Sequence, residues 1–140
     1  MTAEPDRLLE KWLAAADAGE FDAFDDFLHH DVVVHAPLGL SSNGIEEEKA
    51  VWRAALEAMP DLRHEVQEVV TQGSSTAARV VVTGTLVRTY AGVAATGRPF
   101  RLDQVVFAHI RDGRAGEIWE IADVGVLLRG PDGSMEPERP

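Results

Sequence analysis

Apolar residues in the first part of the chain recur at helical spacing. A helix is predicted over residues 4–18, and its apolar face consists of Leu8, Leu9, Trp12, Leu13 and Ala16. A second, short helix is predicted over residues 21–28, with a stripe formed by Phe21, Phe24, Phe27 and Leu28. A third is predicted over residues 45–59, where Pro60 ends it because proline cannot continue a helix. Each of these apolar faces is expected to pack into a core.

After Pro60 the period changes from 3.6 residues to two, which is typical of strands. Strands are predicted over residues 62–70, 76–90, 100–111 and 117–124, after a short earlier strand over residues 31–35. Gly84, inside the second of the four, is expected to mark a bend or bulge. Helices followed by a meander predict an α+β fold, in which N-terminal helices pack within a strongly curved, mixed, mainly antiparallel sheet. Such a cone has a mouth and an apolar interior suited to a small molecule.

Length and charge narrow the functional classes. The chain has 140 residues, enough for a single domain over residues 1–128, and the Pro-rich end at 129–140 is expected to be a mobile tail. The 13 basic and 24 acidic residues give a formal net charge of −11, which argues against a nucleic-acid or anionic-membrane partner. No stretch has the pattern of a signal peptide or a membrane span, so a cytoplasmic location is expected.

One acidic residue near the end of the last predicted strand is the main candidate for chemistry. Asp123 shares a strand face with Trp119 and Ile121, because side chains alternate along a strand. We expect this face to line a pocket, where desolvation against the indole would raise the pKa of the carboxyl group and strengthen it as a base. The alternative is that Asp123 caps the turn that begins at Val124.

The register of the last hairpin decides whether His109 can join Asp123. A two-residue loop, 112–113, would pair residue 111 with 114 and leave His109 on the other face. A three-residue loop, 112–114, would pair 117 with 109, 119 with 107 and 123 with 103, and would place Phe107, His109, Trp119 and Asp123 on one face. We favour the three-residue loop, because Gly113 suits its left-handed position and Phe107 would pack across from Trp119.

Further candidates for a substrate pocket are scattered along the chain. His35 ends a strand beside a loop and either lines the mouth or faces solvent; Tyr90 either donates a hydrogen bond to a substrate oxygen or packs; Trp52 is expected in the core or the pocket wall. His64 alternates with Leu62 and Val66, so it is expected to point inward and to be hydrogen-bonded to a backbone carbonyl. No metal site is predicted, because the acidic and histidine residues between 29 and 35 lack ligand spacing and the chain has no cysteine.

Several short motifs in a fixed order resemble one family. They are residues 59–63 (Met-Pro-Asp-Leu-Arg), Gly92 followed by Thr96-Gly97-Arg98, residues 111–114 (Arg-Asp-Gly-Arg), and Trp119 with Asp123. Together they resemble the SnoaL-like polyketide cyclases of the nuclear transport factor 2-like superfamily, over about residues 5–130. The resemblance implies the cone fold, a homodimer formed through the outer sheet face, and a cofactor-free intramolecular aldol ring closure. It also implies that Asp123 is the acid/base group and His109 its neighbour.

Two classes of function follow from these observations. The first is a small cofactor-free cyclase or isomerase that acts on an apolar carbonyl-bearing substrate, with Asp123 and His109 as catalytic residues and Trp119, Phe107, His35, Tyr90, Ile121 and Trp52 around the substrate. The second is a non-catalytic module that binds a hydrophobic small molecule or dimerises. An epoxide hydrolase-like activity is a third alternative, for which the sequence identifies no cluster of polar groups around one water.

Overall fold

The structure is a computed structural model, and it describes residues 5–128. In chain order its elements are α1 (Pro5–Asp17), the 3₁₀ helix η1 (Phe21–Asp26), β1 (Leu28–His35), β2 (Ser42–Asn43), α2 (Ile45–Ala58), β3 (Arg63–Gln72), β4 (Ser75–Thr85), β5 (Pro99–Arg111), β6 (Arg114–Ala122) and α3 (Gly125–Leu128). None of the helices in this described part is both long and apolar enough to cross a membrane.

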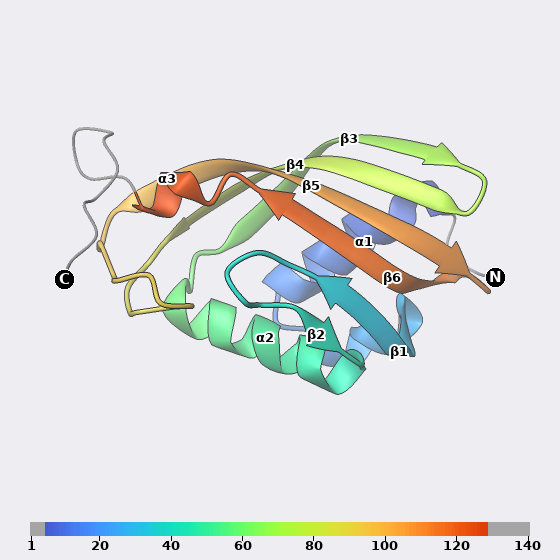
Figure 1. Ribbon diagram of the computed structural model, residues 1–140, viewed down its shortest axis with the longest axis horizontal. Coiled ribbons are helices and arrows are strands. Elements are labelled where there is room, and N and C mark those ends of the chain that lie inside the picture. Colours follow the sequence, from blue (N-terminus) through green and yellow to red (C-terminus); the bar gives the residue numbers. More distant parts are fainter. Residues whose placement is uncertain (1–4, 129–140) are drawn as a thin grey trace.

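A six-stranded sheet forms most of the molecule, in the order β2-β1-β6-β5-β4-β3. All neighbouring strands are antiparallel except β1 and β6, which are parallel. The sheet curves over α1 and α2, so that both helices cover its inner face (Figure 1). This arrangement confirms the predicted α+β cone with a mixed, mainly antiparallel sheet.

The core lies between α1 and the inner face of the sheet. Side chains of α1 are fully buried there, as their helical spacing predicts: Leu8, Leu9, Trp12, Leu13 and Ala16. The ring of Trp12 meets Phe24 edge-on at 6.1 Å and Trp52 at 5.9 Å, which ties both helices and η1 together. The predicted aromatic stripe therefore packs into the core, although the segment forms a 3₁₀ helix.

The hairpin between β5 and β6 combines the two registers that the sequence allowed. Its loop has two residues, Asp112 and Gly113, both with positive φ, so the predicted three-residue loop is wrong. A bulge then shifts the register between 109 and 110, and beyond it the predicted pairs of 109 with 117 and 107 with 119 are confirmed. The bulge falls at Gly116, where an added Cβ would lie 2.9 Å from Nη1 of Arg111.

Other local predictions need correction. The strand predicted over 76–90 ends at Thr85, and the two-residue strand β2 lies in a segment predicted as loop. Gly84 marks no bulge, because β4 pairs with β5 without interruption from 75 to 85. A Cβ at this position would lie 3.1 Å from the ring of Phe100, so a larger residue would require that ring to shift. The predicted tail over residues 129–140 lies outside the described residues.

Candidate functional site

A pocket opens between α2, the loop that follows β1, and the inner face of the sheet. It holds about 740 Å³ of empty space, counted out to its open mouth. Most of its wall is apolar: Ala36, Pro37, Leu38, Leu40, Val51, Ala55, Met59, Leu62, Val82, Phe100, Leu102, Ala122, Val124 and Leu127. The polar side chains in the wall are Glu48, Trp52, His64, Tyr90, Gln104 and Glu120. A few polar groups in an apolar hollow are typical of a small-molecule site.

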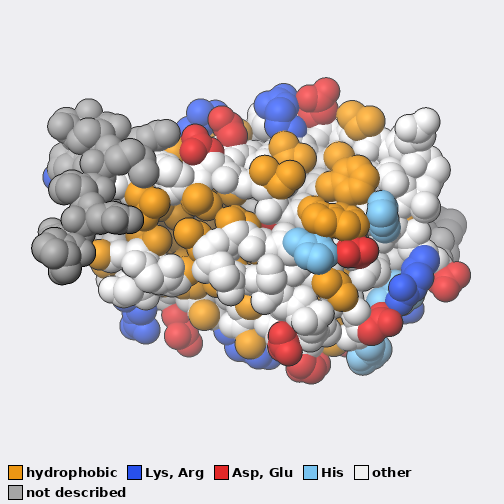
Figure 2. Space-filling model, in the orientation of Figure 1, with side chains coloured by type: hydrophobic (Ala, Val, Ile, Leu, Met, Phe, Trp, Pro, Cys, Tyr) orange, Lys and Arg blue, Asp and Glu red, His pale blue; other side chains and the backbone are white. Residues whose placement is uncertain are grey.

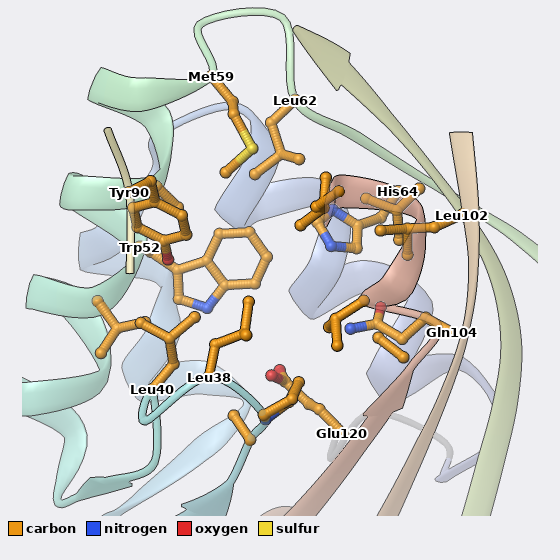
Figure 3. A pocket seen from close by; sticks show the side chains of 18 of the residues that line it. Leu38, Leu40, Trp52, Met59, Leu62, His64, Tyr90, Leu102, Gln104 and Glu120 are labelled. Carbon is orange, nitrogen blue, oxygen red and sulfur yellow. The ribbon is translucent and has the colours of Figure 1, made fainter. Parts of the chain in front are cut away.

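Glu120 places a carboxyl group inside this pocket. It lies on β6 between Trp119 and Ile121, which face outward, so strand alternation turns its side chain to the inner face (Figure 3). Burial, together with the nearby charge of Glu48, raises the pKa of Glu120 to about 8. Only roughly one molecule in ten therefore carries an ionised Glu120 at neutral pH.

Glu48 of α2 is the second acid of the pocket, and it is almost completely buried, with 1% of its surface exposed. The Oγ of Ser42 donates a hydrogen bond to its Oε1 at 2.8 Å, and the Nε1 of Trp52 donates to its Oε2 at 3.0 Å. Burial raises the pKa of Glu48, and these two donors oppose that shift because they favour the carboxylate. Since both oxygens accept from neutral donors, Glu48 is the better placed of the two acids to hold the negative charge.

Two further polar groups point into the same space. Tyr90 is held in the β4–β5 connection by paired backbone hydrogen bonds with Val93, and burial together with Glu120 and Glu48 raises its pKa to about 12. It therefore keeps its hydroxyl proton as a donor. Gln104 of β5 is 9% exposed, and its Oε1 is buried without a hydrogen-bond partner among the described residues. Because buried polar groups are normally paired, this oxygen is suited to accept a hydrogen bond from a ligand.

His64 of β3 also lines the pocket, and its partner is a carboxylate. Its Nδ1 lies 2.7 Å from Oδ1 of Asp17, the last residue of α1, and its backbone N–H donates to Oδ2 of the same side chain. Both side chains are largely buried, with 6% of His64 and 15% of Asp17 exposed. The inward orientation of His64 is confirmed, but its predicted backbone-carbonyl partner is wrong.

The predicted cluster around Asp123 forms on the other face of the sheet. Trp119 packs against Phe107, His109 and His35, with ring centroids 5.7, 5.0 and 5.2 Å away. The Nε2 of His35 lies 2.7 Å from Oε2 of Glu117, and both are exposed. Figure 2 shows histidine, acidic and apolar side chains side by side on the face of the molecule that is turned to the viewer. The sequence was right that these rings share a face, but that face does not line the pocket.

Six predicted site residues are therefore placed differently from expectation. Asp123 is exposed at the end of β6, and Ile121 is 67% exposed. Phe107, His109, Trp119 and His35 lie with them on the outer face and are absent from the pocket wall. The physical reason is that alternation shows which residues share a face, whereas the helices decide which face is covered. Of the predicted substrate-contacting residues, Trp52 and Tyr90 do line the pocket.

The pattern for SnoaL-like polyketide cyclases matches residues 6–130, nearly the whole chain. The chain belongs to the SnoaL-like polyketide cyclase family. Among solved structures, this SnoaL-like protein is similar to IdmH from Streptomyces antibioticus, which is provisionally described as a polyketide cyclase. The TM-score is 0.79 and the identity 28%, over 90% of this chain and 96% of IdmH.

Two other structures extend the comparison. TsrD from Streptomyces laurentii has a TM-score of 0.76 and 28% identity, over 86% of this chain and 89% of TsrD. AclR from Streptomyces galilaeus, provisionally described as a hydroxylase, has a TM-score of 0.75 and 23% identity, over 91% of this chain and 95% of AclR, and shows the shared fold alone. A search of curated proteins found no match.

The histidines near β1 of this SnoaL-like protein have separate partners. His29 Nε2 lies 2.6 Å from the carbonyl oxygen of Arg111, and His30 Nε2 lies 4.0 Å from Oδ1 of Asp25. Across residues 5–128, no group of three or more His, Cys, Asp or Glu side chains is arranged to hold a metal ion.

Proposed function

We propose that this protein is a small cofactor-free enzyme that carries out acid/base chemistry on an apolar carbonyl-bearing substrate, with Glu120 as its acid/base residue. The reaction class is an intramolecular aldol-type cyclisation or a related isomerisation. The observation that carries the proposal is a carboxyl group, Glu120, inside an apolar pocket with its pKa raised to about 8. A group whose pKa lies near the working pH is suited to both give and take a proton.

In this mechanism Glu120 begins as a proton donor. Its proton passes to a substrate carbonyl oxygen while a base removes a proton from the adjacent carbon, which yields an enol and the Glu120 carboxylate. The enol carbon then bonds to a second carbonyl carbon of the same molecule, and the electrons of that carbonyl become an alkoxide. The enol proton returns to Glu120, and the alkoxide takes the proton from the base. The net reaction is an isomerisation that needs no oxidant or reductant.

A module that only binds an apolar ligand is the alternative, and the two acids of the pocket favour the enzyme. Two acids, Glu48 and Glu120, in the same low-dielectric pocket lower the stability of the fold, whereas apolar side chains in their place would not. Strongly shifted carboxyl groups that share a pocket are common at catalytic sites. Leu38 adds to this picture, since it lines the pocket with a φ of 60°, a strained backbone conformation for leucine.

The proposal is tested with a model substrate, a methylcyclohexanedione that carries an oxobutyl arm and closes by an intramolecular aldol addition. In deuterium oxide, the wild-type protein is expected to catalyse exchange of the hydrogens next to the arm's ketone and to form the bicyclic ketol. Both processes are followed by proton NMR and should saturate with substrate. Saturable binding without exchange or closure would identify a binding module instead.

We further propose that the protein forms a homodimer through the outer sheet face. Apolar side chains are exposed there on β5 and β6, with Val105 at 42% and Ile121 at 67%. Ile121→Lys is expected to convert the dimer to a monomer in analytical ultracentrifugation. Val87→Lys is the matched control, because Val87 is 52% exposed in the connection between β4 and β5, outside the sheet. A wild-type monomer, or equal effects of both variants, would contradict the proposal.

A further inference from the structure

The proposed acid/base reaction requires a base in addition to Glu120, and the Asp17–His64 pair lies where such a base would act. A neutral Glu120 donates a proton, so a separate group must remove the proton from carbon. In Figure 3, His64, Gln104 and Glu120 point from different strands toward the same space, opposite Trp52 and Tyr90. Within the described residues, the pocket wall offers two candidate bases, His64 and the carboxylate of Glu48. Both oxygens of Glu48 already accept hydrogen bonds from other side chains.

The hydrogen bond to Asp17 determines which ring nitrogen of His64 carries the proton. A carboxylate accepts and does not donate, so Nδ1, 2.7 Å from Oδ1 of Asp17, carries the hydrogen. The lone pair of a neutral ring is then on Nε2. No hydrogen bond to Nε2 is present among the described residues, while the ring lines the pocket and lies 5.1 Å from the ring of Trp52.

A purely structural link between α1 and β3 would not require the ring. The backbone N–H of His64 already donates to Oδ2 of Asp17, and this bond alone ties the end of α1 to the start of β3. The second bond, from Nδ1 to Oδ1, instead fixes the rotation and tautomer of the imidazole. Partners of this kind orient a histidine for proton transfer in many enzymes.

We propose that His64 is the general base of the pocket and that Asp17 is its positioning residue. The inference rests on the proposed function, and it specifies a substrate whose acidic carbon–hydrogen bond faces His64 while its carbonyl oxygen faces Glu120. Nε2 takes the proton from carbon as Glu120 gives its proton to the carbonyl oxygen. The imidazolium then protonates the alkoxide formed in ring closure, which restores neutral His64. Asp17 stays ionised and balances the charge of the imidazolium.

His64→Asn tests the base directly. The amide nitrogen of asparagine occupies the place of Nδ1, so this variant keeps the hydrogen bond to Asp17 while it removes Nε2 and the outer part of the ring. Exchange and closure of the model triketone are expected to fall at least about 100-fold in kcat, as for loss of a general base. The melting temperature is expected to stay close to that of the wild type. His30→Asn, at an exposed histidine outside this pocket wall, is the matched control and should keep full activity.

Asp17→Asn tests the positioning role. Its amide N–H₂ would face Nδ1, which moves the imidazole hydrogen to Nε2 and removes the lone pair from the pocket. We expect a lower kcat with an unchanged KM, and nitrogen-15 NMR of the imidazole should show the inverted tautomer. A loss of stability with the wild-type tautomer and kcat would mean a structural role only.

The outcomes separate this inference from the proposed function. If His64→Asn keeps wild-type exchange and closure while Glu120→Gln loses them, His64 is not the base and the proposed function stands. If the wild type shows neither process, the proposed function fails. If His64→Asn does not fold, the tautomer of wild-type His64 decides, since a hydrogen on Nε2 would overturn the inference.

Discussion

Glu120→Gln is expected to lower the kcat for closure of the model triketone at least about 100-fold at neutral pH, because glutamine cannot transfer a proton. Glutamine has nearly the same size and polarity, so substrate should still fit between Glu48 and Tyr90 and KM should change little. Initial rates of ketol formation across a range of triketone concentrations measure both constants. A fall in kcat without a change in KM assigns Glu120 to the chemical step.

Two variants serve as comparisons for that result. Glu117→Gln makes the same substitution on the outer face of β6, where Glu117 contacts His35, and it should leave the rate unchanged. Asp123→Asn tests the residue that the sequence first suggested, and it should also be active because Asp123 lies outside this pocket wall. An inactive Asp123→Asn variant beside an active Glu120→Gln variant would reverse the assignment.

The same Glu120→Gln substitution is expected to stabilise the fold at alkaline pH. An acid whose pKa is raised on folding binds its proton more tightly in the native state, so wild-type stability falls as pH rises from the unfolded value of 4.5 to about 8. Glutamine removes this loss. The difference in free energy of unfolding between the variant and the wild type should therefore change in favour of the variant by about 5 kcal/mol across this range, and stay constant above it.

Urea denaturation at several pH values measures this difference. The groups that face Glu120 across the pocket, Glu48, Tyr90 and His64, are present in both proteins, so their direct contributions largely cancel. A difference between the two proteins that does not change with pH would mean that Glu120 titrates normally. The double variant with Glu117→Gln should behave like Glu120→Gln alone, since Glu117 is exposed.

The fold followed from the sequence because the periodicities were regular. The faces of α1 and α2 and the change of period after Pro60 were sufficient to predict helices covering a curved, mainly antiparallel sheet. The hairpin register beyond the bulge was also predicted, although its loop was not. A two-residue loop followed by a bulge at Gly116 gives the same pairing further along the strands as a three-residue loop does. The predicted pairing of Phe107 with Trp119 was therefore correct although the predicted loop was not.

The site was harder to predict, because it depends on which face of β6 the helices cover. Trp119 and Ile121 looked like inward residues by polarity, yet Ile118 and Ala122 occupy the inner face with Glu120 between them. A usable signal was present in β5, where Val106, Ala108 and Ile110 form an unbroken apolar alternation that identifies the covered face. The pairing of Asp17 with His64 joins residues far apart in the chain, and no local pattern predicts it.

Glu120 is a neutral acid in an apolar pocket, and the decisive measurement is the titration of its carboxyl group in the folded protein. Carbon-13 NMR of the side-chain carboxyl groups, assigned by comparison with Glu120→Gln, follows that titration in the wild-type protein. A midpoint of about 8 is expected for Glu120, and it should shift down when Glu48→Gln removes the neighbouring charge. A midpoint near the ordinary glutamate value of 4.5 would contradict it.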